Sequence, residues 1–380
     1  MKICFWGNIS GSLTGNMSGG GELQVALLAR AFAKLGHEVV ILDYNVDEKF
    51  QTEEGIKVYP IKGWFKGIKM LRILTHRIPG LYSSLKDQNA DLYYCRIRDY
   101  MHIFALLAAR KLKAKFILGI ASDLDIVSFG KRWKYYYSTN LRNLQVLIDG
   151  ILFEVVKPWL LHKSDKIFVQ HIGQKEFLLK KNVNSVVFTN LIDLTEIPVI
   201  SNPARKDFVY VGWLDKRKGF VEFFELVRKS PSHTFKVIGP PRDKTGYSYY
   251  EKLKSFPNVS LLGKLNHMET IYHIADSKAL ISTSPMEGFP NIFIEAWACG
   301  IPVLSLLFDP GGVIKRERLG EIANGNLDEL INDMAFVGNT KEFSERVKNY
   351  VARHHVLTAE KMTELDCLVR ELFNKENSRI

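Results

Sequence analysis

Cysteine is scarce in this chain of 380 residues, which contains only Cys4, Cys95, Cys299 and Cys367. None of the four stands in a C-x-x-C pair or in a Cys/His spacing. A disulfide framework and a zinc site of the usual patterns are therefore excluded.

Long apolar runs are lacking as well. No stretch reaches the roughly 18 uninterrupted apolar residues that span a bilayer. The start shows no signal-peptide pattern, because Lys2 is followed only by a strand-length apolar run. We therefore expect a cytoplasmic protein. With 46% hydrophobic and 24% charged residues, the chain can bury the cores of two ordinary domains.

Acidic residues are missing from residues 55–86, which carry seven Lys or Arg and one His. The formal net charge of +11 divides unevenly, with +9 in residues 1–200 and +2 in residues 201–380. A basic half suggests a polyanionic partner, either nucleic acid or an anionic membrane surface.

Helical spacing within residues 55–86 would place the lysines near one face and the large apolar residues near another. This pattern resembles an amphipathic helix that lies in a membrane interface. The alternative is an ordinary solvated face. We expect no nucleic acid, and a peripheral contact with the inner face of the cell membrane through Lys62, Trp64, Phe65, Lys66, Lys69, Arg72 and Arg77.

Short apolar runs alternate with helical patterns along residues 1–190. The expected strands are residues 2–7, 37–43, 57–61, 91–96, 115–120, 166–170 and 185–190, and the expected helices are 101–112, 141–161 and 174–181. This order predicts an α/β fold with a doubly wound parallel sheet.

Residues 196–206 are polar and contain two prolines, which is typical of a linker. A second alternating series follows, with strands expected at 208–213, 234–238, 259–262, 279–284 and 303–307, and helices at 220–227, 249–256, 268–275 and 291–299. We expect an N-terminal domain of residues 1–197, a C-terminal domain of residues 198–345, and closing helices in residues 346–380.

Residues 2–43 form a strand, a glycine-rich loop, a helix and a second strand, with Gly19, Gly20 and Gly21 at the start of the helix. Glycines let the backbone approach a phosphate at a helix N-terminus. The phrase G-x-G-x-x-G is absent, so a nicotinamide cofactor is not indicated.

Residues 278–303 predict a buried strand, a turn-rich loop and a helix that ends at Gly300. The loop follows the carboxyl end of a strand, where open α/β sheets bind ligands. Glu287 lies in this loop, and Glu295 lies on the helix among apolar residues. A buried carboxylate is costly without a hydrogen-bond partner, so Glu295 needs either sugar hydroxyls or a lysine.

The complete phrase E-G-F-P-N-x-x-x-E-A-x-A-C-G-x-P-V resembles the donor-sugar signature of retaining glycosyltransferases with the GT-B architecture, in particular family 4 (group 1). The resemblance implies two Rossmann-like domains facing across a cleft, with the C-terminal helix crossing back to the N-terminal domain. It further implies a nucleotide-diphosphate sugar as co-substrate, most often a UDP- or GDP-sugar, and no other cofactor.

The resemblance also assigns a donor site. Glu287 would bind hydroxyls of the transferred sugar, Glu295 would hold the ribose, and Lys218 would offset charge on the diphosphate. Trp213 stands where the family has an arginine, which Arg217 would replace. Further donor contacts would come from Gly19, Gly20, Gly239, Leu265, Gly288, Phe289, Pro290 and Asn291.

On the acceptor side, residues 116–123 lie where related enzymes often have a strand that ends in a histidine, and no histidine is present. Asp123 is the candidate for the acceptor-facing group, or else a helix N-cap. We expect Asp123, Lys218 and Glu287 to carry catalysis. Three further residues could face the same cleft: Arg96, Arg98 and His171.

Asp123 and Asp125 also form a D-x-D pair, the spacing with which another glycosyltransferase architecture holds a metal. The donor signature favours neutralisation of the diphosphate by backbone amides and Lys218, so we expect no metal. In similar enzymes the donor phosphate helps to deprotonate the acceptor hydroxyl, and the anomeric configuration is retained.

The expected function is the transfer of a sugar to a glycan or a lipid-linked acceptor, with family habit suggesting bacterial cell-envelope polysaccharide biosynthesis. An epimerase or a phosphorylase on the same architecture is disfavoured by the E-G-F-P-N phrase. The alternative is a non-catalytic nucleotide-sugar-binding partner of another glycosyltransferase, motivated by Trp213 and the missing histidine.

Overall fold

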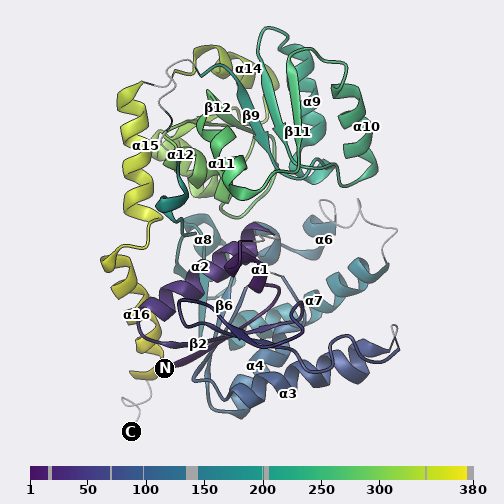
Figure 1. Cartoon of the computed structure of the whole chain (residues 1–380), viewed down its shortest axis with the longest axis vertical. Helices are drawn as coiled ribbons and strands as arrows, with labels where there is room; N and C mark the ends of the chain where they lie inside the picture. Colours follow the sequence, from purple (N-terminus) through teal and green to yellow (C-terminus); the bar gives the residue numbers. More distant parts are fainter. Residues whose placement is uncertain are drawn as a thin grey trace. The chain divides into compact units, whose positions relative to one another are not determined.

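The computed structural model describes residues 1–15, 19–68, 71–96, 98–133, 144–198, 200, 205–338 and 340–374, and only the backbone of residues 144 and 336. The chain divides into two compact units (Figure 1). Unit 1 comprises Met1–Ile126, Arg142–Leu191 and Leu357–Ile380, and unit 2 comprises Val127–Leu141 and Ile192–Val356.

Unit 1 is built on an eight-stranded sheet in the order β3-β4-β2-β1-β5-β6-β7-β8. Its strands are β1 (Lys2–Trp6), β2 (Glu38–Asp43), β3 (Phe50–Gln51), β4 (Lys57–Pro60), β5 (Leu92–Arg96), β6 (Lys115–Gly119), β7 (Lys166–Val169) and β8 (Val186–Val187). All neighbours run parallel except β3 and β4, which pair antiparallel at one edge. The predicted doubly wound parallel sheet is confirmed, while the short edge strand β3 was not predicted.

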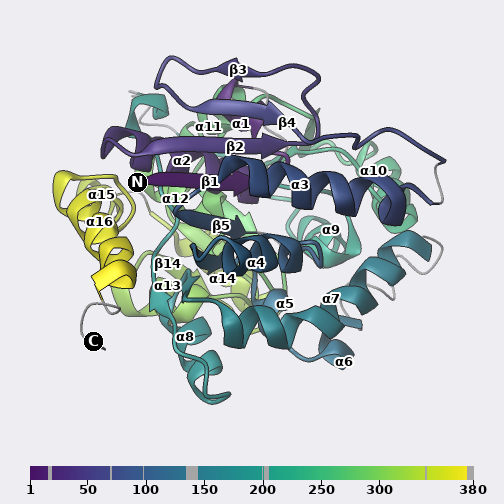
Figure 2. The ribbon, with the colours of Figure 1, turned by 90° about the horizontal axis from the view of Figure 1, so that it is seen from below.

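Two helical layers cover the two faces of this sheet. Successive side chains of a strand point to opposite faces, so the apolar residues of one strand contribute to both cores. Cys4 and Trp6 of β1 enter the core beneath α3, α4 and α7, whereas Ile3 and Phe5 enter the core beneath α2 and α16 (Figure 2). The helices of unit 1 are α1 (Ser10–Leu13), α2 (Gly20–Lys34), the π-helix η1 (Ile73–Arg77), α3 (Ile78–Gln88), α4 (His102–Lys111), α5 (Asp123–Ile126), α7 (Leu144–Lys163), α8 (Ile172–Leu179) and α16 (Ala359–Asn374).

The C-terminal helix α16 belongs to unit 1, although α15 (Lys341–His354) before it belongs to unit 2. Leu365 and Val369 of α16 are fully buried in the core with α2. His37 Nε2, at the start of β2, lies 3.1 Å from the carboxylate of Asp366 on α16. The expected return of the last helix to the N-terminal domain is confirmed.

Unit 2 is built on a parallel sheet in the order β11-β10-β9-β12-β13-β14. Its strands are β9 (Phe208–Val211), β10 (Phe235–Ile238), β11 (Val259–Gly263), β12 (Ala279–Ser282), β13 (Val303–Ser305) and β14 (Gly320–Ile322). The strands are almost entirely apolar, as expected for a parallel sheet with both faces covered. Both units are therefore Rossmann-like, as predicted.

One face of the unit 2 sheet packs against α9, α10 and α14, and the other against α11, α12, α13 and α15. The helices and single turns of unit 2 are α6 (Phe129–Arg132), η3 (Leu194–Glu196), η4 (Lys216–Lys218), α9 (Phe220–Lys229), α10 (Lys244–Leu253), α11 (His267–Ala275), α12 (Asn291–Ala298), η5 (Pro310–Gly312), α13 (Val313–Glu317), α14 (Leu327–Phe336) and α15. Trp297 of α12 is fully buried, and its Nε1 donates to the carbonyl of Leu319 at 2.8 Å.

The amphipathic helix predicted within residues 55–86 is wrong. Residues 62–65 form turns, and the helical structure begins with η1 and continues as α3. Gly63 and Gly67 have φ angles of 66° and 80°, which are incompatible with a right-handed helix. Two glycines in five residues were a readable sign of this interruption. Lys69, one of the expected membrane contacts, lies outside the described residues.

Candidate functional site

The carboxyl edge of the unit 2 sheet contains a topological switch point. β9 lies between β10 and β12, and the chain leaves β9 towards β10 but leaves β12 towards β13, on the opposite side. Ligands of open α/β sheets bind at such a point, outside the carboxyl ends of the strands. The loops after β9 and β12 meet there, and they contain Lys218 and Glu287 respectively.

Lys218 and Glu287 are in direct contact, since the ammonium of Lys218 forms an ion pair with Glu287 Oε1. The buried carboxylate of Asp215 holds the turn before Lys218 by accepting a hydrogen bond from its backbone amide at 3.0 Å. Both charged side chains remain partly exposed, at 34% for Lys218 and 20% for Glu287. The structure thus brings two residues that lie far apart in the sequence to one accessible position.

Gly219 fixes the approach of these two loops. Its φ of 67° is left-handed, and a Cβ there would collide with the carbonyl oxygen of Thr283. Thr283 Oγ1 in turn donates to the carbonyl of Gly219 at 2.7 Å, and the hydroxyl of Tyr210 donates to the carbonyl of Lys218 at 3.1 Å. The loop after β9 is therefore fastened to the end of β12, which explains the glycine after Lys218.

Arginine is present near Trp213, although Trp213 occupies the place of the family arginine. Trp213 is 42% exposed, and the guanidinium of Arg242, from the loop after β10, lies 4.8 Å from the centre of its ring. Arg217, the expected substitute, forms an ion pair with Asp215 at 2.6 Å. Sequence reasoning missed Arg242, because it is 29 positions beyond Trp213 and only the fold brings the two together.

The loop after β12 leads into α12, whose N-cap is Pro290, a residue that makes no side-chain capping hydrogen bond. Backbone amides at such a helix start favour an anionic group. Gly288, Pro290 and Asn291 line this transition, while Phe289 is buried, with its ring 4.9 Å from that of His355. Within residues 287–291, Phe289 therefore anchors the loop in the core, while Glu287 and Asn291 remain partly exposed.

Glu295 has a partner that the sequence did not predict. Its Oε1 lies 3.0 Å from Nε2 of His267, and Nδ1 of the same ring lies 3.1 Å from the carboxylate of Glu196. Burial by itself would lower the pKa of His267, but the hydrogen bonds with Glu196 and Glu295 outweigh it and raise the pKa to about 9. The imidazole is therefore protonated at neutral pH and offsets the charge of Glu295, whose side chain is only 7% exposed.

Gly239 and Leu265 stand at the ends of β10 and β11. The amide of Gly239 donates to the carbonyl of Gly263 at 2.7 Å, and its φ of 129° suits glycine alone. A Cβ at Gly239 would also collide with the carbonyl oxygen of Gly212. Leu265 lies in the turn before α11, packed against the core. These two residues therefore belong to the same edge as Lys218.

Unit 1 carries the remaining predicted residues, and Asp123 is the best defined of them. It follows β6, and its Oδ1 lies 3.1 Å from Nε2 of His171 and accepts a hydrogen bond from Gln174 Nε2 at 2.8 Å. His171 follows the neighbouring strand β7 and is 7% exposed. No histidine ends β6, but the adjacent strand supplies one to the same carboxylate.

A second hydrogen-bonded group lies at the same edge of unit 1. Arg96, at the end of β5, donates to Asn190 Oδ1 at 2.6 Å, and Gln170 Nε2 donates to the same oxygen at 2.9 Å. All three side chains are buried. Sequence reasoning named Arg96 but missed Gln170 and Asn190, which carry no motif.

Gly19 is the N-cap of α2 and has an extended backbone, and Gly20 is the first residue of that helix. The residues just before them, 16–18, lie outside the described part of the chain. The carboxylate of Glu22 lies close to Gly19, and burial raises its pKa.

The two carboxylates of the D-x-D pair serve different partners. Asp125 Oδ2 accepts hydrogen bonds from the backbone amides of Ala121 at 3.0 Å and Ser122 at 2.9 Å, whereas Asp123 binds His171. Asp125 thus stabilises the turn after β6. Within the described ranges, no three His, Cys, Asp or Glu side chains gather as a metal site requires.

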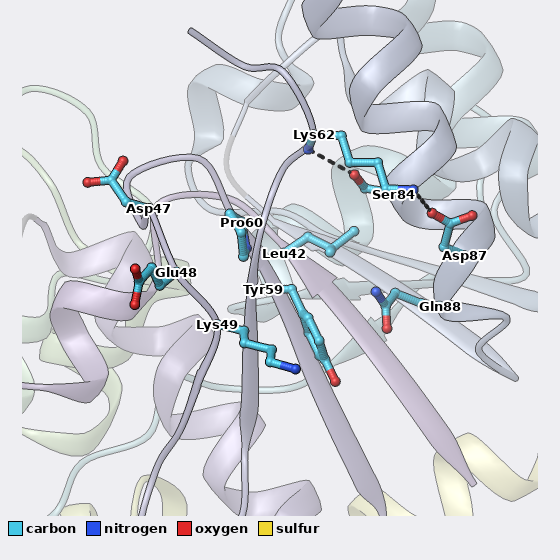
Figure 3. Close-up of a pocket in the computed structure, with 10 residues that line it drawn as sticks. All are labelled: Leu42, Asp47, Glu48, Lys49, Tyr59, Pro60, Lys62, Ser84, Asp87 and Gln88. Carbon is cyan, nitrogen blue, oxygen red and sulfur yellow. Dashed lines mark hydrogen bonds and ion pairs between the residues drawn. The ribbon is translucent and has the colours of Figure 1, made fainter.

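Lys62 and Trp64, two of the expected membrane contacts, also have structural roles within unit 1. Beside a surface pocket of about 570 Å³, the ammonium of Lys62 pairs with Asp87 and its amide donates to Ser84 Oγ at 3.1 Å (Figure 3). Trp64 is only 8% exposed, because it stacks on Tyr44 with ring centres 5.0 Å apart. Both residues attach this segment to the body of unit 1.

Four large apolar side chains of the same segment face solvent. We call them the η1 patch, and they are Phe65 (59% exposed), Ile68 (71%), Leu71 (54%) and Leu74 (71%). Among the residues that the model describes, no helix is long and apolar enough to cross a bilayer.

Two Rossmann-like units, each built on a largely parallel sheet, are the architecture of GT-B glycosyltransferases. Residues 18–196 match the model of Glycosyltransferase Family 4, and residues 196–354 match that of glycosyl transferases group 1. The chain therefore belongs to the group 1, family 4 glycosyltransferases, which use nucleotide sugars.

Similar proteins agree with this assignment. An uncharacterized glycosyltransferase of Haemophilus influenzae is 23% identical over 348 residues, which cover 86% of this chain and 88% of that protein. Sucrose-phosphate synthase from Thermosynechococcus elongatus shares the fold, with a TM-score of 0.76 and 15% identity over 98% of this chain and 99% of that chain. The HepE protein of Anabaena, solved with UDP-glucose, has a TM-score of 0.65 and 12% identity over 99% and 100% of the two chains.

Proposed function

We propose that this chain is a retaining, metal-independent hexosyltransferase that uses a UDP- or GDP-sugar, in bacterial cell-envelope polysaccharide biosynthesis. The observation that carries the proposal is the contact of Lys218 with Glu287 beside the start of α12. A cation, a helix N-terminus and a carboxylate there match a diphosphate next to a sugar with free hydroxyls. The UDP-glucose complex of the HepE protein supports the choice of donor.

The residues of unit 2 have separable roles in this proposal. Lys218 exchanges its partner Glu287 for the donor diphosphate and stabilises the charge that develops as the nucleotide leaves. Glu287, thus released, accepts hydrogen bonds from the hydroxyls of the transferred sugar. Glu295, held by His267, accepts hydrogen bonds from the ribose. Positioning and charge stabilisation, with the donor phosphate as the base for the acceptor hydroxyl, then suffice for front-face transfer.

Unit 1 would bind the acceptor, a glycan or a lipid-linked glycan. Asp123 and His171 form a polar pair at the carboxyl edge of its sheet, which is where the acceptor hydroxyl would be oriented. This pair also weakens the argument for a non-catalytic protein, because an imidazole is available although β6 does not end in histidine.

We further propose that unit 1 binds the inner face of the membrane as a peripheral protein through residues 62–77. The η1 patch supports this, since four exposed large apolar side chains in ten residues are unusual on a water-facing surface. Lys66 is exposed beside the patch and would meet an anionic lipid headgroup.

The proposed reaction is tested with the purified protein and a panel of nucleotide sugars. Thermal shift identifies the donor, because a bound ligand stabilises the fold by mass action. Release of free sugar from that donor is then measured with the wild type and with Lys218→Ala. Hydrolysis by the wild type alone supports an enzyme, whereas binding with no free sugar from either protein supports the non-catalytic partner. Retention is read from the anomeric configuration of the transferred product by NMR.

A further inference from the structure

The outer face of α7 is apolar along its length. The α7 stripe consists of Ile148 (46% exposed), Ile151 (47%), Leu152 (38%), Val155 (67%) and Trp159 (62%). They follow Ile148 by three, four, seven and eleven residues, a pattern that places all five on one side of the helix, over about 16 Å at 1.5 Å per residue. No other element of the described chain has as many exposed large apolar residues.

The inner face of α7 is apolar too. Phe153, Leu160 and Leu161 are buried in the core beneath α3 and α4. A helix that is apolar all round is normally buried all round. Here the core satisfies one side, and the described residues leave the other side in water. The stripe therefore needs an explanation outside the core of unit 1.

Neither acid of α7 lies on its exposed apolar face. The helix carries two acidic residues, Asp149 and Glu154, and both are partly buried. Glu154 forms an ion pair with Lys157 at 2.6 Å. Burial, and then the charge of Asp99, raises the pKa of Asp149 to about 6 against the opposing charge of Arg77. The exposed residues at the end of the helix are His162 and Lys163, so the rim is basic.

The segment with the η1 patch leads into α3, which covers the same face of the unit 1 sheet as α7. Arg77, the last residue of η1, is close enough to Asp149 of α7 to influence its pKa. Figures 1 and 2 place the first turns of α3 and of α7 at the same end of this layer. The segments that carry the two apolar surfaces thus begin at the same end of unit 1.

We propose that the α7 stripe is a second contact with an anionic lipid bilayer, lying in the headgroup region parallel to the membrane surface. This inference rests on the proposed membrane contact of residues 62–77 and adds α7 as a second membrane-binding element. A bilayer accounts for a neutral apolar face on a convex helix, for a basic rim, and for Trp159 next to Lys163, because tryptophan and basic residues favour the interface. It also makes a lipid-linked acceptor the substrate class, because the acceptor-binding unit then rests on the lipid surface.

The two membrane contacts can be separated by vesicle co-sedimentation. The vesicles contain phosphatidylcholine and phosphatidylglycerol, and the proteins are the wild type, Val155→Ser/Trp159→Ser, Ile68→Ser/Leu74→Ser and the combination of all four changes. Binding of the α7 variant should be about tenfold weaker or more, since two large apolar side chains no longer enter the lipid. Leu179→Ser on α8, a residue that is 57% exposed, is the matched control and should bind like the wild type.

Each outcome decides between the contacts. Weaker binding of the α7 variant alone supports the α7 stripe and contradicts the role of residues 62–77, and the reverse result overturns the present inference. Circular dichroism checks that the variants are folded. The loss caused by the α7 variant should persist at high salt, because screening acts on charges and not on apolar burial.

A second copy of the chain is the competing occupant of the stripe. If the wild type sediments as a dimer in analytical ultracentrifugation and Val155→Ser/Trp159→Ser as a monomer, the stripe is an oligomer interface and the proposal is wrong. Trp159→Phe gives a complementary readout, since it keeps an apolar side chain. It should bind vesicles like the wild type but lose part of the vesicle-induced blue shift of tryptophan fluorescence. An unchanged blue shift would contradict the placement of Trp159 in the lipid.

Discussion

At the carboxyl edge of the unit 2 sheet, acids are paired with cations, whereas at the same edge of unit 1 they are held by neutral donors and one imidazole. Lys218 pairs with Glu287, and a protonated His267 joins Glu295 to Glu196. In unit 1, Asp123 binds His171 and Gln174. The proposed donor and acceptor sites therefore face different electrostatic demands. A donor diphosphate brings and then releases charge, while an acceptor hydroxyl needs only orientation and a path for its proton.

Of the substitutions considered, the loss of the Glu287 carboxylate should have the largest effect on activity. We expect Glu287→Ala to abolish transfer, because the sugar hydroxyls lose their carboxylate and Lys218 loses its partner. Steady-state transfer assays with the identified donor measure the effect. Glu225→Ala, on the outer surface of α9, is the matched control and should keep wild-type activity. Substantial turnover by Glu287→Ala would remove this residue from the site.

The proposed contact of Glu295 with the ribose is tested by Glu295→Ala. Ribose hydroxyls left without a hydrogen-bond partner reduce the binding free energy by ~1–3 kcal/mol, which corresponds to about one to two decades in donor affinity. Isothermal titration with the donor reports the change directly. If affinity is unaltered while the protein melts earlier, Glu295 serves only to anchor His267.

Asp123→Asn should act on the other edge and leave the donor site intact. We expect kcat to fall about tenfold, because the orientation of His171 is lost, while the affinity for the donor remains unchanged. The two quantities are measured on the same preparation. A change in donor affinity without a change in kcat would contradict the division of roles between the two units.

The local structure of residues 279–299 could be predicted because its signals are contiguous in the sequence. Residues 287–295 carry the loop, the helix start and both carboxylates within nine positions, and the structure places them together. The partners of these residues could not be predicted. His267 precedes Glu295 by 28 residues and reaches it only because α11 and α12 pack on the same face of the sheet.

The helical periodicity of the side chains was misleading where glycines with positive φ angles interrupt the helix. The lysines and apolar residues of 62–78 fit a helix, but Gly63 and Gly67 adopt positive φ angles and Trp64 turns inward onto Tyr44. Conversely, α10 begins at Lys244, earlier than its apolar pattern indicates. The side chain of Asp243 caps it by accepting a hydrogen bond from the amide of Gly246.

The His267 link should make stability depend on pH in a defined direction. Its pKa is raised from 6.5 to about 9 in the folded chain, so its stabilisation is complete below about pH 6.5 and is lost as the pH rises through about 9. We expect the melting temperature of the wild type to fall towards that of His267→Asn between neutral and alkaline pH. A constant difference between the two proteins up to pH 10 would contradict a charged His267.

The smallest expected effect is that of EDTA, which should leave turnover unchanged. The D-x-D pair is the counter-argument, since two carboxylates and phosphate oxygens would suit Mg²⁺ or Mn²⁺. Asp125, however, already accepts hydrogen bonds from two backbone amides, while Asp123 is oriented by His171 and Gln174. The two carboxylates therefore serve different partners, and in the proposed donor site Lys218 and the start of α12 would supply positive charge for a diphosphate. The test is turnover after dialysis against excess EDTA, with Asp125→Asn as a second arm. Activity that disappears and returns with Mn²⁺ would assign the diphosphate to a metal and remove the contrast between an edge whose acids are paired with cations and an edge whose Asp123 is held by Gln174 and an imidazole.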